Sequence, residues 1–148
     1  MSNPARKKID KYTIHLDKKL GVGSFGVVYI GVHDETQQYV AIKMLDKKTS
    51  ISWNYAVDKD EYIKSALFAE IEILKTLKST NIVGFLDVME SANNYYIVQE
   101  YCDGGDLRGY LTKKGNIPEK EAINIITQVC NGFVEILKEG VIHRYSLC

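Results

Sequence analysis

The residues best suited to chemistry are three glycines near the N-terminus. A G-x-G-x-x-G-x-V pattern is formed by Gly21-Val22-Gly23-Ser24-Phe25-Gly26-Val27-Val28. Because glycine has no Cβ, the backbone at Gly21, Gly23 and Gly26 can adopt positive φ and approach another molecule closely. Its N–H groups can then point at phosphate oxygens. The segment therefore predicts a phosphate-binding loop.

The residues after the loop decide which kind of loop it is. A dinucleotide-binding fold has the same glycines, but there the loop opens a helix within a βαβ unit. Here the next residues, Val27 to Val32, are mostly β-branched or aromatic and predict a strand. A turn over Asp34–Gln38 and a further predicted strand, Tyr39–Leu45, follow, with Lys43 inside that strand. The order favours a glycine-rich hairpin and a lysine on the next strand.

A helix is predicted from about Lys59 to Lys78. At 100° per residue, one apolar stripe contains Ile63, Ala66, Leu67, Ile73, Leu74 and Leu77. Glu70 lies at the centre of this stripe, and glutamates are rarely buried unless they are paired. We expect Glu70 to pair with Lys43. The alternative is a partly exposed stripe that leaves Glu70 in water.

The rest of the chain completes one α+β unit and begins a second part. The strand pattern predicts five antiparallel strands around one helix, the remaining three strands being Tyr12–Leu16, Asn81–Val88 and Tyr95–Gln99. The segment Glu100–Leu107 contains Gly104 and Gly105 and is either a plain turn or a hinge. Two helices are predicted after it, over Leu107–Lys113 and from Pro118 to about Lys138. The second is apolar on nearly all sides, so it is expected to be buried on most of them.

The composition excludes several classes of protein. The 148 residues are 45% apolar and 26% charged, which is typical of one soluble domain. Nineteen basic and nineteen acidic residues cancel, so net charge does not favour a nucleic-acid partner, and the basic Arg6–Lys8 is expected in a solvated tail. No apolar run reaches membrane-spanning length. Three cysteines without a C-x-x-C pair favour reduced thiols, a cytoplasmic location and no metal site.

Together these motifs resemble the first half of a eukaryotic protein kinase domain of the serine/threonine type, from about residue 12 to 144. The resemblance is carried by the glycine loop, Ala41-x-Lys43, Glu70, Glu100-Tyr101-Cys102 with Asp106, and His143-Arg144. The segments 68–74 and 96–107 are most similar to the autophagy-initiating kinases. The implied divisions are a flexible tail (1–11), a small lobe (12–101), a hinge with the start of an incomplete large lobe (102–144) and a non-homologous tail (145–148).

The resemblance implies that the chain binds ATP, together with Mg²⁺ in the complete family member. The glycine loop, including Val22, Ser24 and Phe25, would cover the phosphates, and Lys43 would hold the α- and β-phosphates while Glu70 positions it. The adenosine contacts would come from Val28 and Ala41 on the adenine faces, the backbone of Glu100 and Cys102 on its edge, Asp106 on the ribose, and Gln99 as gatekeeper.

The resemblance breaks after Arg144. The family motif is H-R-D-x-x-x-x-N, whose aspartate receives the substrate hydroxyl proton and whose asparagine binds magnesium. Tyr145 stands at the aspartate position, and a phenol with a pKa near 10 does not accept a proton at neutral pH. No magnesium ligand of the family is recognisable, so we interpret the end as a frameshift, a retained intron or a truncated gene.

Two functions stay open from the sequence. The chain is either a piece of a serine/threonine kinase that phosphorylates proteins with MgATP, or a non-catalytic nucleotide-binding or decoy protein that binds a kinase partner. Sequencing the transcript beyond the Arg144 codon distinguishes them, because the enzyme requires a frame that continues Asp-Leu-Lys-x-x-Asn. The sequence does not identify the protein substrate, the activating signal or the oligomeric state.

Overall fold

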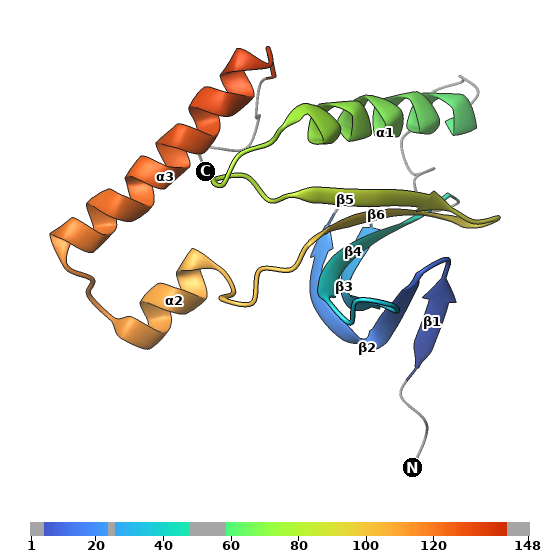
Figure 1. Ribbon diagram of the computed structural model, residues 1–148, viewed down its shortest axis with the longest axis horizontal. Helices are drawn as coiled ribbons and strands as arrows, with labels where there is room; N and C mark the ends of the chain where they lie inside the picture. The colour runs from blue at the N-terminus through green and yellow to red at the C-terminus, as the bar shows by residue number, and fades with distance from the viewer. Residues whose placement is uncertain (1–4, 24–25, 48–58, 142–148) are drawn as a thin grey trace. The chain divides into compact units, whose positions relative to one another are not determined.

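The computed structural model describes residues 5–23, 26–47 and 59–141, without the side chains of 59–64, 66, 67 and 70. Figure 1 shows a curled sheet and helices. The strands are β1 (Arg6–Ile9), β2 (Tyr12–Gly23), β3 (Gly26–His33), β4 (Tyr39–Asp46), β5 (Phe85–Glu90) and β6 (Asn94–Glu100), and the helices are α1 (Lys59–Thr76), α2 (Leu107–Lys114) and α3 (Glu119–Lys138).

The chain forms two compact units. The first contains Met1–Glu72 and Phe85–Tyr101, and the second contains Ile73–Gly84 and Cys102–Cys148. The boundary after Tyr101 falls within the segment that was predicted to be a turn or a hinge. The assignment of Ile73–Gly84 to the second unit was not predicted from the sequence.

The first unit is built on a single antiparallel sheet with the strand order β1-β2-β3-β4-β6-β5. The predicted α+β class and the small-lobe architecture are confirmed, but the sheet has six strands rather than five. The extra strand is β1, which lies inside the segment expected to be a flexible tail. Its backbone pairs with β2, and Ile9 packs against the core. The sequence did not predict this strand, because three of its four residues are basic and only Ile9 is apolar.

The core of this unit lies on one face of the sheet. Cross-strand pairing places Tyr29 opposite Ile42 and Ile42 opposite Val98. Paired residues share a face, so the alternating β-branched and aromatic residues of three strands meet there. Ile42, Tyr96 and Val98 are fully buried. The Tyr96 hydroxyl is 3.3 Å from Ser91 Oγ, which gives the buried phenol a hydrogen-bond partner.

The second unit contains α2 and α3, whose ends are set by recognisable caps. Asp106 begins α2, because its Oδ1 accepts a hydrogen bond from the Gly109 N–H at 2.7 Å. At the end of α3, Gly140 has a φ of 70° and Val141 N–H donates to Ile136 O, which is a Schellman arrangement. The predicted start near Pro118 and the predicted end at Lys138 both agree with the structure.

The expectation that α3 is buried on most sides is wrong. Gly132 is its only buried residue, and a Cβ there would lie 3.0 Å from Asn81 O. Large apolar side chains are exposed on the rest of the helix: Ile123, Ile126, Val129, Val134 and Leu137. No helix in the described part of the chain is long and apolar enough to cross a bilayer.

Candidate nucleotide-binding site

The glycine-rich segment forms the tip of the β2–β3 hairpin, as its sequence predicts. Gly21 is paired with Val28, and Gly23 is paired with Gly26 across the two strands. The hairpin does not use the positive φ that glycine permits, because the described glycines with positive φ are Gly105, Gly115 and Gly140. Paired strand residues have extended backbone, so the hairpin does not need the left-handed region at these positions.

Gly26 is required by close approach. A Cβ at this position would lie 2.2 Å from Met44 O and 3.0 Å from the Met44 carbonyl carbon. The β3 backbone therefore passes too close to β4 for any side chain at its first residue. By contrast, a Cβ at Gly21 would meet nothing within 4 Å. Only one of these two glycines is thus imposed by packing within the chain.

Four of the predicted ligand-contacting residues share one face of the sheet. Val28 is directly opposite Lys43, which extends from the middle of β4. Ala41 lies two residues from Lys43 and is opposite Gln99 on β6. Since side chains at i and i+2 of a strand lie on the same face, these four side chains form one continuous surface. We call Val28, Ala41, Lys43 and Gln99 the open face.

Burial distinguishes the open face from the opposite side of the same strands. All four of its residues are half-buried. Their neighbours on the opposite side, Tyr29, Val40 and Ile42, are 7% exposed or less. The curled side of the sheet is thus filled by the chain's own side chains, while the open face retains accessible apolar surface beside a lysine. This chemistry suits a flat heterocycle that carries phosphate.

The register adds three residues that sequence reasoning missed. Ile97 is opposite Lys43 and only 1% exposed, so the face is covered at this point, and the other two are Ile30 and Phe85. Ile30 is opposite Ala41, and Phe85 is opposite Gln99, so both belong to the same face. Both are half-buried. The period of two from Val28 could have identified Ile30. Phe85 could not have been found, because its pairing with β6 depends on a register shift between Phe85 and Asp87.

Other predicted residues lie outside what the structure describes. Glu70 is on α1, but its side chain is not described, so its pairing with Lys43 stays a prediction. On the same helix, Ile71 is only 1% exposed, although the predicted apolar stripe did not include it. Ser24, Phe25 and Tyr145 also lie outside the described residues.

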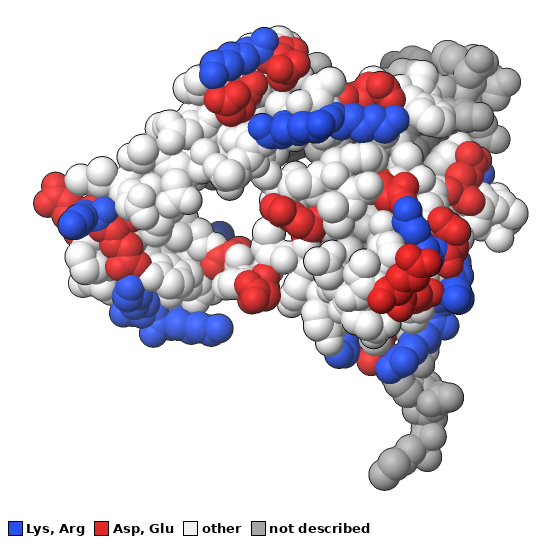
Figure 2. Space-filling view, in the orientation of Figure 1, with Lys and Arg blue, Asp and Glu red and all other residues white. Residues whose placement is uncertain are grey.

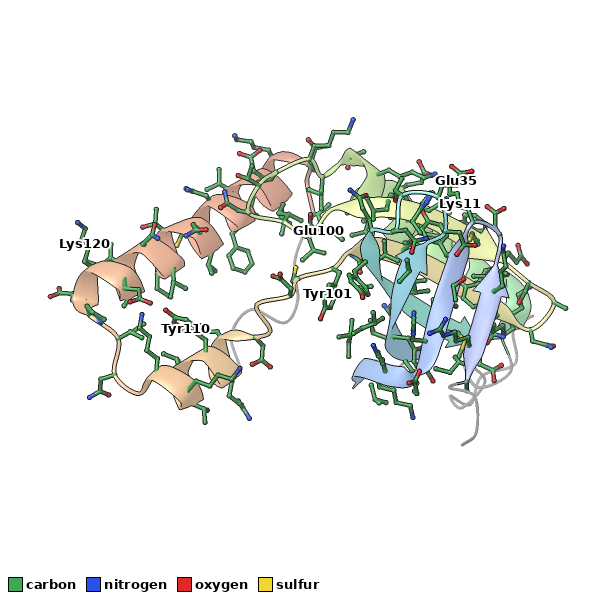
Figure 3. The ribbon with its side chains drawn as sticks, turned by 60° about the horizontal axis from the view of Figure 1, so that its bottom comes forward. Lys11, Glu35, Glu100, Tyr101, Tyr110 and Lys120 are labelled. Atoms are coloured by element: carbon green, nitrogen blue, oxygen red, sulfur yellow. The ribbon has the colours of Figure 1, made fainter. Side chains whose placement is uncertain are left out.

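The predicted hinge residues are divided between the two units. Glu100 ends β6 and is exposed in the first unit, beside Tyr101 (Figure 3). The Tyr101 ring packs against Tyr39 at a centroid distance of 6.1 Å. Cys102 and Asp106 belong to the second unit and are exposed there. The Asp106 carboxylate caps α2 through Oδ1, and its other acceptor sites could still make the predicted ribose contact.

Val22, near the end of β2, is 76% exposed, so this end of β2 extends into solvent. Within residues 5–23, 26–47 and 59–141, no three His, Cys, Asp or Glu side chains gather where they could hold a metal ion. The described chemistry of the site is therefore an apolar surface, one lysine and the backbone of a protruding hairpin.

Comparison with known proteins shows that the chain is similar to protein kinases. The protein kinase domain family matches residues 14–145. The chain is 36% identical to the human hormonally up-regulated neu tumor-associated kinase over 138 residues, which are 93% of this chain and 18% of that protein. It is 37% identical to the serine/threonine-protein kinase unc-51 of Caenorhabditis elegans over 129 residues, or 84% of this chain and 14% of that one. It is 33% identical to ATG1a, a serine/threonine-protein kinase of Arabidopsis thaliana, over 129 residues, which are 87% of this chain and 19% of that protein.

The chain thus spans about a fifth or less of the length of these relatives. The family match covers the glycine hairpin, the lysine-bearing strand, the hinge segment and both helices of the second unit. The resemblance to the serine/threonine kinases is confirmed by the relatives that carry this name. The chain belongs to the protein kinase domain family.

Proposed function

We propose that this chain is the nucleotide-binding part of a serine/threonine protein kinase and that ATP binds on the open face. The observation that carries the proposal is the shared, half-buried face of Val28, Ala41, Lys43 and Gln99, next to the glycine hairpin. The adenine ring packs on Val28 and Ala41, and the Lys43 ammonium contacts the phosphates. Similarity to ATG1a and unc-51 supports the serine/threonine type. It also supports the expected resemblance to the autophagy-initiating kinases.

The other parts of the proposal follow the family. The backbone of Glu100 and Cys102 binds the adenine edge, Asp106 binds the ribose, and the hairpin from Gly21 to Gly26 covers the phosphates. Magnesium, when bound, neutralises the phosphate charge during transfer. The complete protein transfers the γ-phosphate to serine or threonine of a protein substrate, and a cytoplasmic location is part of the same proposal.

Binding of ATP to the 148-residue chain tests the proposal directly. We expect saturable binding by calorimetry or NMR, with a Kd on the order of 0.1–1 mM, which corresponds to about 4–5.5 kcal/mol. Lys43→Met should weaken binding at least about tenfold, because a charge-assisted contact to phosphate is lost. Lys120→Met on α3 removes the same charge in the second unit and should leave the Kd unchanged (Figure 3). Equal Kd values for the two variants would reject the open face as the site.

A second candidate function is supported by one residue. Tyr145 occupies the position of the family's catalytic aspartate, which favours a non-catalytic protein that binds nucleotide or a kinase partner. In that case the 148-residue chain binds ATP but transfers no phosphate, since a neutral phenol does not accept the substrate proton near pH 7. A phosphotransfer assay with radiolabelled ATP decides this. Labelled protein that disappears in Lys43→Met would reject the non-catalytic function.

A further inference from the structure

The N-terminal strand and the turn after it contact other parts of the sheet besides the neighbouring strand β2. The protein kinase family match begins at residue 14, so β1 and its turn precede it. Ala5 O accepts a hydrogen bond from Leu16 N–H at 2.9 Å, and Lys11 O accepts one from Asp34 N–H at 2.8 Å. Residues 5–11 are therefore tied to β2 and to the turn between β3 and β4. We call residues 5–11 the N-terminal clasp.

The clasp also reaches the opposite end of the sheet. Lys11 Nζ lies 2.9 Å from Asp87 Oδ2 on β5, and the Tyr12 hydroxyl lies 3.5 Å from the same oxygen. β1 and β5 are the two terminal strands in the sheet order, separated by four other strands. These contacts can form only because the sheet curls until its two ends approach each other. In Figure 3, Lys11 lies at the turn between β1 and β2.

A second contact closes the same gap from within the clasp. Lys7 Nζ lies 5.3 Å from the centroid of the Tyr96 ring on β6, which is within the range of a cation–π interaction. The pairing of Lys7 with Ile14 and of Ile9 with Tyr12 directs both clasp side chains toward the core face. The Asp87 hydrogen bond and charge raise the pKa of Lys11, so the ammonium stays charged across the neutral range.

We propose that the N-terminal clasp closes the curled sheet, with Lys11 and Asp87 as its fastening pair. The clasp holds β5 and β6 against β2, and β2 and β6 also carry the glycine hairpin and Gln99. The curvature of the sheet that supports the candidate site thus depends on a segment that precedes the matched kinase domain. The proposal does not depend on whether ATP binds.

Hydrogen exchange of the 148-residue chain tests the clasp. We compare Lys11→Met with Lys8→Met, because Lys8 also belongs to the clasp but its ion-pair partner is Asp34, in the turn between β3 and β4. Lys11→Met should accelerate amide exchange in β5 about three- to fivefold. Loss of a partly exposed ion pair costs little free energy, but it makes local opening of β5 more frequent. Lys8→Met should leave β5 exchange unchanged.

The location of the change distinguishes closure from general stability. A clasp requires that Lys11→Met affects β5 more than the central pairing of β3 with β4. Asp87→Asn keeps the hydrogen bond that its Oδ1 accepts from Val88 N–H but removes the charge, and it should reproduce the effect of Lys11→Met. Uniform acceleration over the sheet, or no acceleration in β5, would show that β1 is only a sixth strand and would overturn the proposal.

Discussion

Single residues in this chain are constrained for different reasons, and the glycines of the hairpin show the difference. Gly26 is constrained by the Met44 carbonyl, whereas Gly21 has open space around the position of a Cβ. In the proposed function, Gly21 instead lets the backbone approach a ligand closely. Stability and binding therefore assign different roles to two glycines of the same motif.

Gly26→Ala should destabilise the first unit by about 1–3 kcal/mol, because the new methyl group forces β3 away from β4. Gly21→Ala is the matched control. It should change the free energy of unfolding by less than about 1 kcal/mol, and toward greater stability, because the unfolded chain loses freedom. Urea unfolding followed by circular dichroism measures both. Equal losses of stability would contradict the packing argument.

At the scale of elements, the positions of the strands were more predictable than the register in which they pair. The alternation of apolar residues located β3, β4 and β6 to within about two residues, because each has one buried face. The length of β2 was missed. Its second half, Asp17 to Gly23, is exposed and therefore has no apolar alternation. The open face follows from the pairing register of the strands. This register depends on the turns and the bulges, so the sequence of a single strand does not predict it.

The pairing of β4 with α1 stays a prediction and can be tested by a double-mutant cycle. Lys43→Met and Glu70→Gln should be non-additive in the free energy of unfolding by about 0.5–3 kcal/mol if the two side chains are partners. Lys43→Met combined with Glu35→Gln is the control. Glu35 lies in the exposed turn before β4 (Figure 3), so these two changes should add. Additivity in both cycles would reject the ion pair.

The junction of α2 with α3 should be sensitive to acid. Glu121 accepts hydrogen bonds from Lys114 Nζ at 2.7 Å and from the Tyr110 hydroxyl, and these contacts lower its pKa, the Lys114 contact most. A lowered carboxyl pKa in the folded state stabilises the junction above the unfolded value of about 4.3. The stabilisation is lost as the pH falls through the lower, folded value.

An NMR titration of the Glu121 carboxyl carbon measures this effect. The midpoint should lie below the usual glutamate value in the native chain, and Lys114→Met should move it upward. Tyr110→Phe should move it upward by less, because the Tyr110 hydrogen bond lowers this pKa less than the Lys114 contact does. A midpoint that does not respond to Lys114→Met would show that the contact does not persist in solution.

At the scale of the whole molecule, charge and apolar surface are distributed differently in the two units. Over the sheet in Figure 2, Lys and Arg are interspersed with Asp and Glu, whereas an uncharged surface follows α3 between charged residues near its ends. Sequence reasoning located α3 and recognised its apolar character. It could not tell which side is covered, because that depends on the approach of Gly132 to Asn81 within the second unit.

The exposed apolar stripe of α3 leads to the last prediction. Ile123, Ile126, Val134 and Leu137 are 48–65% exposed and lie near one direction of the helix. Full burial of such a side chain is worth about 1.5–3 kcal/mol, so a surface that covers the stripe gains several kcal/mol. Exposed patches of this kind usually mark association. The isolated 148-residue chain should therefore form oligomers at micromolar concentration.

Light scattering of two charge-matched variants tests whether the stripe is responsible. Ile126→Glu with Val134→Lys introduces one charge of each sign into the stripe and should yield a monodisperse monomer. Asn124→Glu with Gln128→Lys introduces the same charges at exposed polar positions of α3 and should leave the association unchanged. Both pairs keep the net charge, so a difference between them isolates apolar contact from charge. If the native chain is monomeric, or if both variants dissociate equally, the stripe does not drive association.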